Sequence, residues 1–328
     1  MPFPSTFATT GSGPLARGAV AAGGTAARTM PMPTSNAPAQ AARLIPLPIR
    51  SATLALRMPR WILSTKPGYL RVAPAAGDAF TPIAAFSTRA GGTSGAPYDS
   101  LNLSEGVGDD TQAVRANRAL LLDALQLAPE QVAYATQVHG ATCLVPQGPG
   151  WAGTGDALAT RHEDLVLAVG TADCLAVLLW DSTRPAVAAA HAGWRGAVAG
   201  VVPRAVSALA ALGSDPLNLR AALGPRIGSC CFAVGPEVAE RFAPEDVRLE
   251  GGRRTVDLAR AVTRQLVLAG LDPASVRDAA LDLEGGACTA CDPGRYYSHR
   301  RDHGRTGRSW GILAPRAATL LANHERGF

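Results

Sequence analysis

Two histidines and one cysteine stand at positions that hydrophobic patterning does not explain. His191 opens the hexapeptide His191-Ala192-Gly193-Trp194-Arg195-Gly196, which joins a short apolar run to an Ala-, Val- and Leu-rich stretch of helical spacing. His139 lies in a Thr-Gln-Val-His-Gly segment, and Cys174 lies inside the apolar stretch 165–180. Two imidazoles and a thiolate suit a zinc or copper ion with one position left open, or a Cys-His pair for nucleophilic catalysis.

Charged side chains accompany these residues. Asp173 precedes Cys174 in the apolar stretch, where an unpaired carboxylate would cost several kcal/mol. We therefore expect Asp173 to be a partner of the ligands or an acid that caps the strand end. Arg195 lies where a helix begins, and unpaired backbone N–H groups there favour an anion. The loop 295–308 holds five arginines, so it is either a solvated charged surface or a phosphate-binding segment.

A family resemblance becomes visible when these segments are taken together. Segments 136–140, 171–174 and 191–196 resemble the signature segments of the laccase-domain family, also called the YfiH-like or polyphenol oxidase family. Further blocks look like the rest of its pattern, in order and with suitable spacing: 86–94, 100–103, 107–110, 117–118, 224–228, Cys231, 234–235, 288–289, 297–302 and 306–308. The resemblance covers about residues 72–328, which we take to be a single catalytic domain.

The resemblance implies a metal site and an activity. In family members two histidines and one cysteine bind zinc, and the matching residues are His139, Cys174 and His191, with Cu²⁺ as the alternative metal. The implied activity is phosphorolysis of purine nucleosides (adenosine, inosine, 5′-methylthioadenosine) to base and ribose 1-phosphate, with adenosine deamination as a side activity. A purine nucleoside and phosphate are thus the expected partners. The candidate phosphate- and substrate-binding residues are Arg89, Asn102, Arg195, Arg300 and Arg308.

Three other functions stay open. The pair Cys174 and His191 could serve an amidase that edits a peptidoglycan precursor, and such an enzyme would survive chelators but not alkylation. A copper polyphenol oxidase is less favoured because the sequence lacks the several His-x-His pairs of a multicopper centre. A non-catalytic interaction module would show neither metal nor activity.

Composition excludes two classes of protein. No uncharged apolar run reaches the about 18 residues that a membrane helix needs, because Asp173 and Arg195 interrupt the best stretches. Residues 1–77 hold seven Arg, one Lys and no acid, a charge of +8; the whole chain carries +5, which leaves −3 for the remainder. A nucleic-acid binder would need its basic surface on the domain itself, so we expect no such partner.

The N-terminal segment and the cysteines complete the domain picture. Residues 1–60 are rich in Ala, Pro, Gly and Ser, and we expect a disordered extension: a transit peptide or, as we favour, the product of a wrongly assigned start before Met58. The six cysteines show no disulfide spacing, which favours a reducing, cytoplasmic setting. Cys288 and Cys291 form one C-x-x-C without a second such pair, so we expect no structural zinc knuckle there. The sequence does not predict the oligomeric state.

Patterning predicts an α+β fold, a mixed β-sheet core flanked by helices, which is the YfiH-like fold that the resemblance implies. We predict strands over 83–87, 132–137, 141–145, 165–170, 175–180, 186–190, 220–223 and 231–234. We predict helices over 111–127, 196–212, 236–242, 258–269 and 314–323. Asp110 should cap the first helix, and Gly213 and Gly270 should end two others.

Overall fold

The computed structural model describes residues 61–73, 75, 77–283 and 285–317. The chain divides into two units, Met1–Ala55 and Leu56–Phe328, and all of the described residues belong to the second. The segment 1–60, for which we predicted disorder, lies outside the described residues, as does 318–323 of the predicted last helix. Every helix in the described part of the chain is too short or too polar to cross a membrane.

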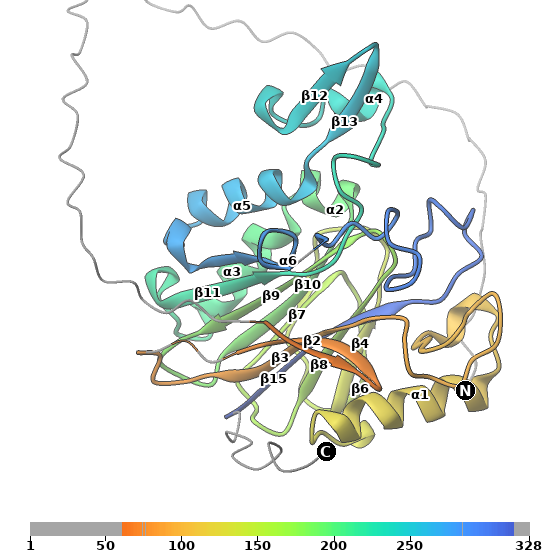
Figure 1. The fold of residues 1–328 in the computed structure, drawn as a ribbon. Coiled ribbons are helices and arrows are strands. Elements are labelled where there is room, and N and C mark those ends of the chain that lie inside the picture. Colours follow the sequence, from red (N-terminus) through yellow and green to blue (C-terminus); the bar gives the residue numbers. More distant parts are fainter. Residues whose placement is uncertain (1–60, 74, 76, 284, 318–328) are drawn as a thin grey trace, which may run out of the picture. The chain divides into compact units, whose positions relative to one another are not determined.

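Two mixed sheets form the centre of the molecule (Figure 1). The first has the order β1 (Trp61–Thr65), β2 (Gly68–Val72), β3 (Pro82–Ser87), β15 (Ser309–Ala317), β8 (Val166–Thr171), β4 (Val132–Thr136) and β6 (Gly150–Thr154). The second has the order β14 (Val276–Asp278), β11 (Leu219–Leu223), β9 (Leu175–Asp181), β10 (Val187–Ala192), β7 (Ala157–Thr160) and β5 (Cys143–Leu144). Each contains both parallel and antiparallel pairs, so the predicted mixed-sheet α+β class is confirmed.

The largest helices cover the outer faces of these sheets, and the described part of the chain contains six helices in all. They are α1 (Thr111–Ala124), α2 (Trp194–Ala199), α3 (Val201–Ala211), α4 (Pro236–Ala239), α5 (Leu258–Leu268) and α6 (Ala279–Asp282). In Figure 1, α1 lies along the first sheet, while α3 and α5 lie over the second; the hairpin β12 (Val247–Glu250) and β13 (Arg253–Val256) projects beside α4. Short 3₁₀ turns occupy Glu105–Val107, Pro129–Gln131, Pro216–Asn218, Pro244–Asp246 and Pro273–Ser275.

The alternation of side chains along β10 shows how the layers fix the site. Val187 and Ala189 pack between the two sheets, whereas Ala188 and Ala190 pack against α3 and α5. Both sets are apolar because both faces of the strand are covered, which explains why it reads as a continuous apolar run. Because alternate side chains of a strand point to the same face, His191 is on the face of β10 that Val187 and Ala189 occupy.

Most predicted elements near the site are confirmed, with small changes at their ends. The strands predicted over 83–87, 132–137, 165–170, 175–180, 186–190 and 220–223 correspond to β3, β4, β8, β9, β10 and β11. The strand predicted over 141–145 shrinks to β5, and the helices predicted over 111–127, 236–242 and 258–269 are α1, α4 and α5. The Asp110 side chain accepts from the Gln112 N–H at the start of α1, as expected of an N-cap. Gly213 and Gly270 follow α3 and α5 with positive φ.

Three predicted elements are wrong. The segment 231–234 makes only an isolated bridge, from Ala233 to Thr255, because Cys231 still belongs to a turn. The helix predicted over 196–212 is two helices, since Gly200 adopts φ 84° and separates α2 from α3. The start of the helix predicted over 314–323 belongs to β15, which pairs with β3 and β8 in the middle of the first sheet.

Candidate metal centre

The three residues singled out in the sequence meet at one end of the sheets. One ligand atom from each of His139, Cys174 and His191 lies within 4.8 Å of the others. The two imidazole rings are 4.9 Å apart between centroids and nearly perpendicular, at 76°. His191 is buried and only 3% exposed, Cys174 is partly buried, and His139 is exposed. The cluster thus has one side that solvent and substrate can reach.

The strand ladder explains why these residues converge. His191 is the fifth residue of β10 and pairs with Ala176 of β9, two residues beyond Cys174. On the other side of β10, Ala190 pairs with Ala157, so that His191 lies beside Asp156 at the start of β7. His139 reaches the same place from the turn that follows β4. Three separate strand ends therefore supply the cluster.

Asp156 organises both histidines. Its Oδ1 lies 2.9 Å from His191 Nδ1, and its backbone oxygen accepts from the His191 N–H at 2.7 Å. The same carboxylate accepts from the backbone N–H groups of Val138, His139 and Gly140 at 3.1, 2.9 and 2.7 Å. A histidine whose Nδ1 donates to a carboxylate presents its Nε2 lone pair to a metal. One buried carboxylate thus orients His191 and fixes the turn that carries His139.

Two glycines allow the close approach of these segments. A Cβ on Gly193 would lie 2.9 Å from Cys174 Sγ and 2.9 Å from His139 Cδ2. A Cβ on Gly196 would lie 2.8 Å from the Gly140 backbone oxygen. His139 itself adopts φ 59°, a left-handed conformation that few residues with a side chain take up. The hexapeptide therefore contributes space as well as an imidazole.

The electrostatics of the cluster favour a thiolate. Burial raises the pKa of the Cys174 thiol, but hydrogen bonds from His139 and His191 and their positive charges prevail and bring it to about 6. Burial lowers the pKa of His191, yet its hydrogen bonds to Asp156 and Cys174 raise it to about 9. Burial also raises the pKa of Asp156, while the His191 contact and the backbone donors outweigh this and lower it. Without a metal, a proton on His191 links the thiolate to the carboxylate.

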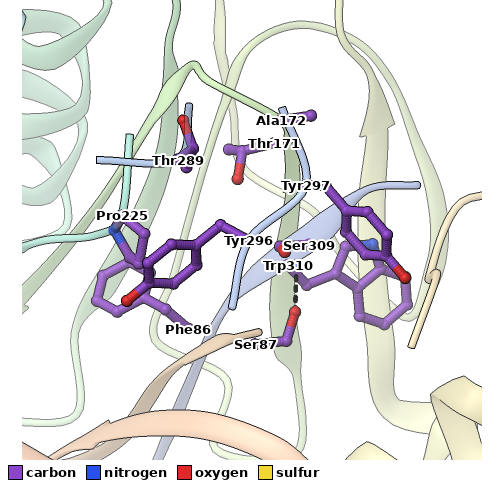
Figure 2. A pocket seen from close by; sticks show the side chains of 10 residues that line it. All are labelled: Phe86, Ser87, Thr171, Ala172, Pro225, Thr289, Tyr296, Tyr297, Ser309 and Trp310. Carbon is purple, nitrogen blue, oxygen red and sulfur yellow. Dashed lines mark hydrogen bonds between the residues drawn. The ribbon is translucent and has the colours of Figure 1, made fainter. Parts of the chain in front are cut away.

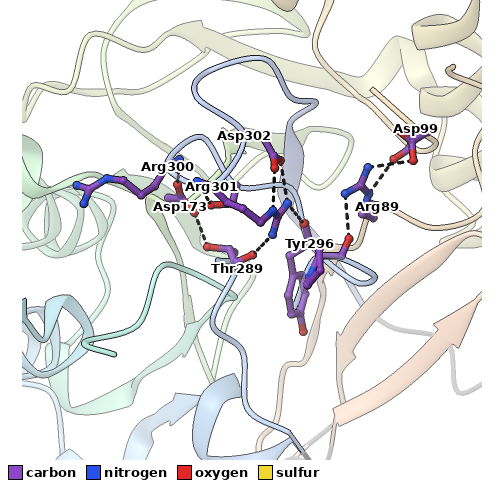
Figure 3. Close-up of polar contacts among 10 residues, drawn as sticks. Arg89, Asp99, Asp173, Thr289, Tyr296, Arg300, Arg301 and Asp302 are labelled. Atoms are coloured by element: carbon purple, nitrogen blue, oxygen red, sulfur yellow. Dashed lines mark hydrogen bonds and ion pairs between the residues drawn. The ribbon is translucent and has the colours of Figure 1, made fainter. Parts of the chain in front are cut away.

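Asp173 makes different contacts from Asp156 (Figure 3). Its Oδ1 accepts from the Thr289 hydroxyl at 2.5 Å, and its Oδ2 accepts from the Arg300 backbone N–H at 2.7 Å. It has a positive φ of 87°. Asp173 thus joins the segment before Cys174 to two C-terminal loops, whereas the carboxylate that contacts the imidazoles is Asp156.

Arg308 is the candidate phosphate ligand whose charge interacts with that of Cys174. Its backbone N–H donates to Asn102 Oδ1 at 2.9 Å, and its Nη1 donates to the backbone oxygens of Thr306 and Gly307. Burial lowers its pKa, while the negative charges of Cys174 and Asp173 act in the opposite direction. The described residues give this guanidinium no salt bridge, so it can pair with an anion beside Cys174.

The other candidates have structural partners of their own. Arg89 donates to Asp99 (Figure 3) and to the Pro293 backbone oxygen. Its guanidinium also lies over the ring of Tyr297. Asn102 is fully buried and holds the Arg308 backbone. Arg300 donates to the Ala233 oxygen at 2.9 Å, and exposed Arg195 lies over the ring of Trp194 at 4.4 Å. Of this group, Arg195 is the one whose guanidinium has no hydrogen bond within the described chain.

A small cavity is lined by Thr171 and Ala172, which precede Asp173 and Cys174 in the chain (Figure 2). Its volume is about 10 Å³, about one water molecule, and Thr171, Ala172, Thr289 and Trp310 are among its lining residues. The Trp310 backbone N–H donates to the Ser87 hydroxyl at 2.9 Å in its wall. This space is too small for a nucleoside, whereas His139 lies on the exposed side of the cluster.

Comparison with known proteins decides the family. The model of the multi-copper polyphenol oxidoreductase laccase family matches residues 83–316. The chain belongs to this laccase-domain family. A purine nucleoside phosphorylase of Deinococcus radiodurans is 42% identical over 234 residues, covering 70% of this chain and 87% of the relative. YlmD from Geobacillus stearothermophilus has a similar structure, with a TM-score of 0.71 and 29% sequence identity, and the match covers 79% of this chain and 99% of YlmD. The hypothetical protein YfiH from Bacillus licheniformis matches with a TM-score of 0.68 and 29% identity, covering 76% of this chain and 96% of YfiH. The predicted YfiH-like fold is confirmed.

Sequence reasoning missed Asp156 in this laccase-domain chain. The segment 157–160 was not predicted as a strand, so nothing marked the residue before it as a neighbour of His191. Its partners lie 16 to 35 positions away along the chain. A helpful signal was the acid after Gly155, directly before the apolar stretch 157–159, the same arrangement that drew attention to Asp173.

Proposed function

We propose that this laccase-domain protein is a zinc-dependent purine nucleoside phosphorylase. It would convert adenosine, inosine or 5′-methylthioadenosine, with phosphate, to the free base and a ribose 1-phosphate. The observation that carries the proposal is the convergence of His139, Cys174 and His191. The charge interaction between Arg308 and Cys174 makes Arg308 the proposed phosphate ligand. The relative from Deinococcus radiodurans, which bears the name purine nucleoside phosphorylase, supports the choice of substrate class.

The donor set fits zinc. Two imidazole nitrogens and one thiolate are borderline-soft ligands, and three protein ligands are typical of catalytic zinc sites. His139 and His191 would bind through nitrogen and Cys174 through sulfur, all within the 4.8 Å that separates their ligand atoms. Zinc bound there would supply a Lewis acid with one coordination position open to a substrate oxygen or to water.

The chain's own residues account for the rest of the reaction. Arg308 would hold phosphate so that one of its oxygens faces the anomeric carbon of the ribose. The new C–O bond forms as the bond between that carbon and the purine nitrogen breaks, and the purine leaves with the proton that hydrogen phosphate gives up. Negative charge from phosphate would stabilise the positive charge that develops on the sugar. Asp156 keeps His191 oriented throughout.

Adenosine deamination is a second candidate activity of the same site. The observation that favours it is that the cluster is exposed at His139, so water can reach a metal bound there. A metal with an open coordination position activates such a water for attack on a purine ring. This reaction needs no phosphate, so it would not depend on Arg308. Comparing both products in one assay separates the two activities.

Two alternatives remain to be tested beside these. An amidase is favoured by the thiolate-imidazolium character of Cys174 and His191, whose pKa values are about 6 and about 9. A copper phenol oxidase corresponds to the name of the matching family model, but in the described chain His139 and His191 are the only histidines in a ligand cluster. Chelation should abolish phosphorolysis and oxidation and leave an amidase active, whereas alkylation of Cys174 should inactivate the amidase.

The deciding experiment incubates the purified zinc-loaded protein with adenosine, with and without phosphate. Adenine and ribose 1-phosphate that form only with phosphate support phosphorylase activity, and inosine that forms in both samples supports deamination. The proposal fails if neither adenosine, inosine nor 5′-methylthioadenosine is cleaved in the presence of phosphate. Oxidation of a phenol by the copper-loaded protein alone would favour the oxidase instead.

A further inference from the structure

Four cysteines form a second cluster outside the candidate metal centre. Cys230 and Cys231 lie in the turn that follows β11, and Cys288 and Cys291 lie in the loop between α6 and β15. Their four sulfur atoms all lie within 4.8 Å of one another. Cys291 Sγ is 3.6 Å from Cys230 Sγ and 3.3 Å from Cys231 Sγ, and all four thiols are free.

The sequence alone did not lead us to expect this arrangement. Cys288 and Cys291 lacked a second C-x-x-C, and a structural zinc site was therefore not expected. The adjacent Cys230 and Cys231 lie next to Cys288 and Cys291 because a tight turn brings them to the same place. Adjacent cysteines have no standard metal-ligand spacing, so their positions in the chain carried no signal.

We propose that Cys230, Cys231, Cys288 and Cys291 bind a structural Zn²⁺ as a tetrathiolate, separate from the centre at His139, Cys174 and His191. The sulfur separations support a mononuclear site. A tetrahedral zinc with bonds of about 2.3 Å to sulfur requires sulfur atoms about 3.8 Å apart. A disulfide would need about 2.05 Å. An iron–sulfur cluster would spread its cysteines over several iron atoms, so it would need a wider set.

The backbone around the cluster is suited to a negatively charged group. The N–H of Gly228 donates to Cys288 Sγ at 3.2 Å, and the N–H of Cys291 donates to the same sulfur. A Cβ on Gly228 would lie 3.2 Å from Cys230 Sγ, so this approach favours glycine. Arg253 donates to the Cys230 backbone oxygen at 3.1 Å, which places a positive charge next to the site. Four thiolates and one Zn²⁺ carry a net charge of −2, which these donors stabilise.

Two of the four cysteines are exposed and two are partly buried, which gives a metal ion a path to the cluster. Binding replaces up to four thiol protons by the ion and releases them to solvent, and it involves no oxidation or reduction. A tetrahedral site filled by four protein ligands leaves no position for a substrate. The role of this ion would therefore be structural.

The segment that the ion would fix contacts the candidate metal centre. Cys288 forms an isolated backbone β-bridge with Arg226. The next residue, Thr289, donates a hydrogen bond from its hydroxyl to Asp173 at 2.5 Å. Arg301 donates to the Thr289 backbone oxygen at 2.6 Å and so ties in the C-terminal loop as well (Figure 3). Asp173 directly precedes Cys174. The tetrathiolate would thus hold together the loops that line one side of the other site.

The test counts metal ions in the purified full-length protein from zinc-supplemented cells. We expect two zinc ions per chain in the wild type, one in Cys174→Ala and one in the double variant Cys230→Ser/Cys291→Ser. Cys143→Ser, which changes a cysteine outside both clusters, should keep two. Cobalt-loaded Cys174→Ala should show the intense thiolate-to-cobalt absorption of a four-sulfur site, a readout that does not depend on activity.

Other results would overturn the proposal. One such result is a wild-type chain with a single zinc ion that is lost completely in Cys174→Ala. Another is a double serine variant that still holds two ions, and a third is iron in place of zinc from zinc-replete cells. A mass lower by two hydrogens, from a disulfide between Cys231 and Cys291, would assign the cluster to redox chemistry. If the double variant fails to fold, the single variant Cys291→His replaces it in the test. This variant should still hold two zinc ions, because a Cys₃His set also binds zinc.

Discussion

The carboxylate of Asp156 lies 2.9 Å from His191 Nδ1, while the backbone oxygen of Asp156 accepts from the His191 N–H at 2.7 Å. Side chain and main chain of the two residues are therefore joined at the edge where β7 meets β10. His191 is only 3% exposed and Asp156 1%, so water does not compete for these contacts. Because the remaining carboxylate oxygen binds the turn of His139, this pair determines the geometry of the whole cluster.

Asp156→Asn should weaken zinc binding. The amide carries no charge to hold the His191 Nδ1 proton, and its N–H₂ group cannot accept from the turn at Val138 and Gly140. We expect about a 10- to 100-fold loss of zinc affinity, as for other carboxylate partners of metal-bound histidines. Competition with a zinc chelator of known affinity measures this change.

The matched control for this substitution is Asp164→Asn, because Asp164 is an exposed acid in the loop before β8. It should leave zinc affinity unchanged. The free energy of unfolding should also fall by about 1–3 kcal/mol in Asp156→Asn, since buried N–H groups lose their acceptor. Equal zinc affinity in the two variants would show that Asp156 does not orient the ligands.

Gly193→Ala should disrupt the cluster by steric contact alone. Its new methyl group would lie 2.9 Å from both Cys174 Sγ and His139 Cδ2, so at least one of these ligands must move. We expect a loss of zinc at the site and at least about a tenfold loss of phosphorolysis, measured side by side. Gly148→Ala is the control, because nothing lies within 4 Å of its Cβ position. Full zinc content in Gly193→Ala would contradict the close approach of the hexapeptide to Cys174.

Zinc uptake should depend on pH in a defined direction. His191 has a raised pKa of about 9, so below that pH zinc must displace a proton from it. Cys174 has a pKa lowered to about 6, so only below that pH must zinc displace a second proton, the one on the Cys174 thiol. Affinity at this site should therefore rise about tenfold per pH unit between pH 6 and 9, more steeply below that range, and level off above it.

The measurement uses metal-free Cys230→Ser/Cys291→Ser protein, so that the second cluster does not contribute, and zinc competition with a chelator at a series of pH values. Asp156→Asn should shift the upper inflection downwards, because the hydrogen bond to the carboxylate is the largest of the contacts that raise the pKa of His191. An affinity that does not change between pH 6 and 9 would contradict the proton on His191.

Arg308→Gln should raise the KM for phosphate by about 10- to 100-fold, the effect of losing a charged hydrogen-bonding partner. The KM for adenosine should change little, and deamination should be unaffected because it uses no phosphate. Arg195→Gln is the informative comparison, since exposed Arg195 stacks only on Trp194. If Arg195→Gln raises the KM for phosphate and Arg308→Gln does not, the phosphate lies at the hexapeptide and the assignment to Arg308 is wrong.

The cluster at His139, Cys174 and His191 was predictable because each residue interrupts or follows an apolar run that forms a strand. The runs that become β8, β9 and β10 are buried on both faces, so their apolar pattern is strong and their ends mark the edge of the sheets. Polar residues at such ends are easily recognised. Which side chains meet there depends on strand order, and that order is not encoded locally.

Other features required the tertiary structure. The segment 314–323 reads as a helix, yet Ala314 lies in β15 and pairs with Ile83 of β3, where ladder hydrogen bonds outweigh helix propensity. Gly200 breaks the predicted helix 196–212 because a left-handed residue was needed where the chain turns from α2 to α3. Asp156 and the four-cysteine cluster join residues that lie far apart in the chain, so spacing rules gave no indication of them.

The central claim is that phosphate itself cleaves the nucleoside at the site of Cys174. The most direct measurement follows adenosine and ¹⁸O-labelled phosphate with the zinc-loaded wild type and with Cys174→Ala. We predict adenine and ribose 1-phosphate in equal amounts, with the label in the oxygen that joins the sugar to phosphorus, and no product from Cys174→Ala. Free ribose without phosphate, or equal turnover by Cys174→Ala, would contradict the account.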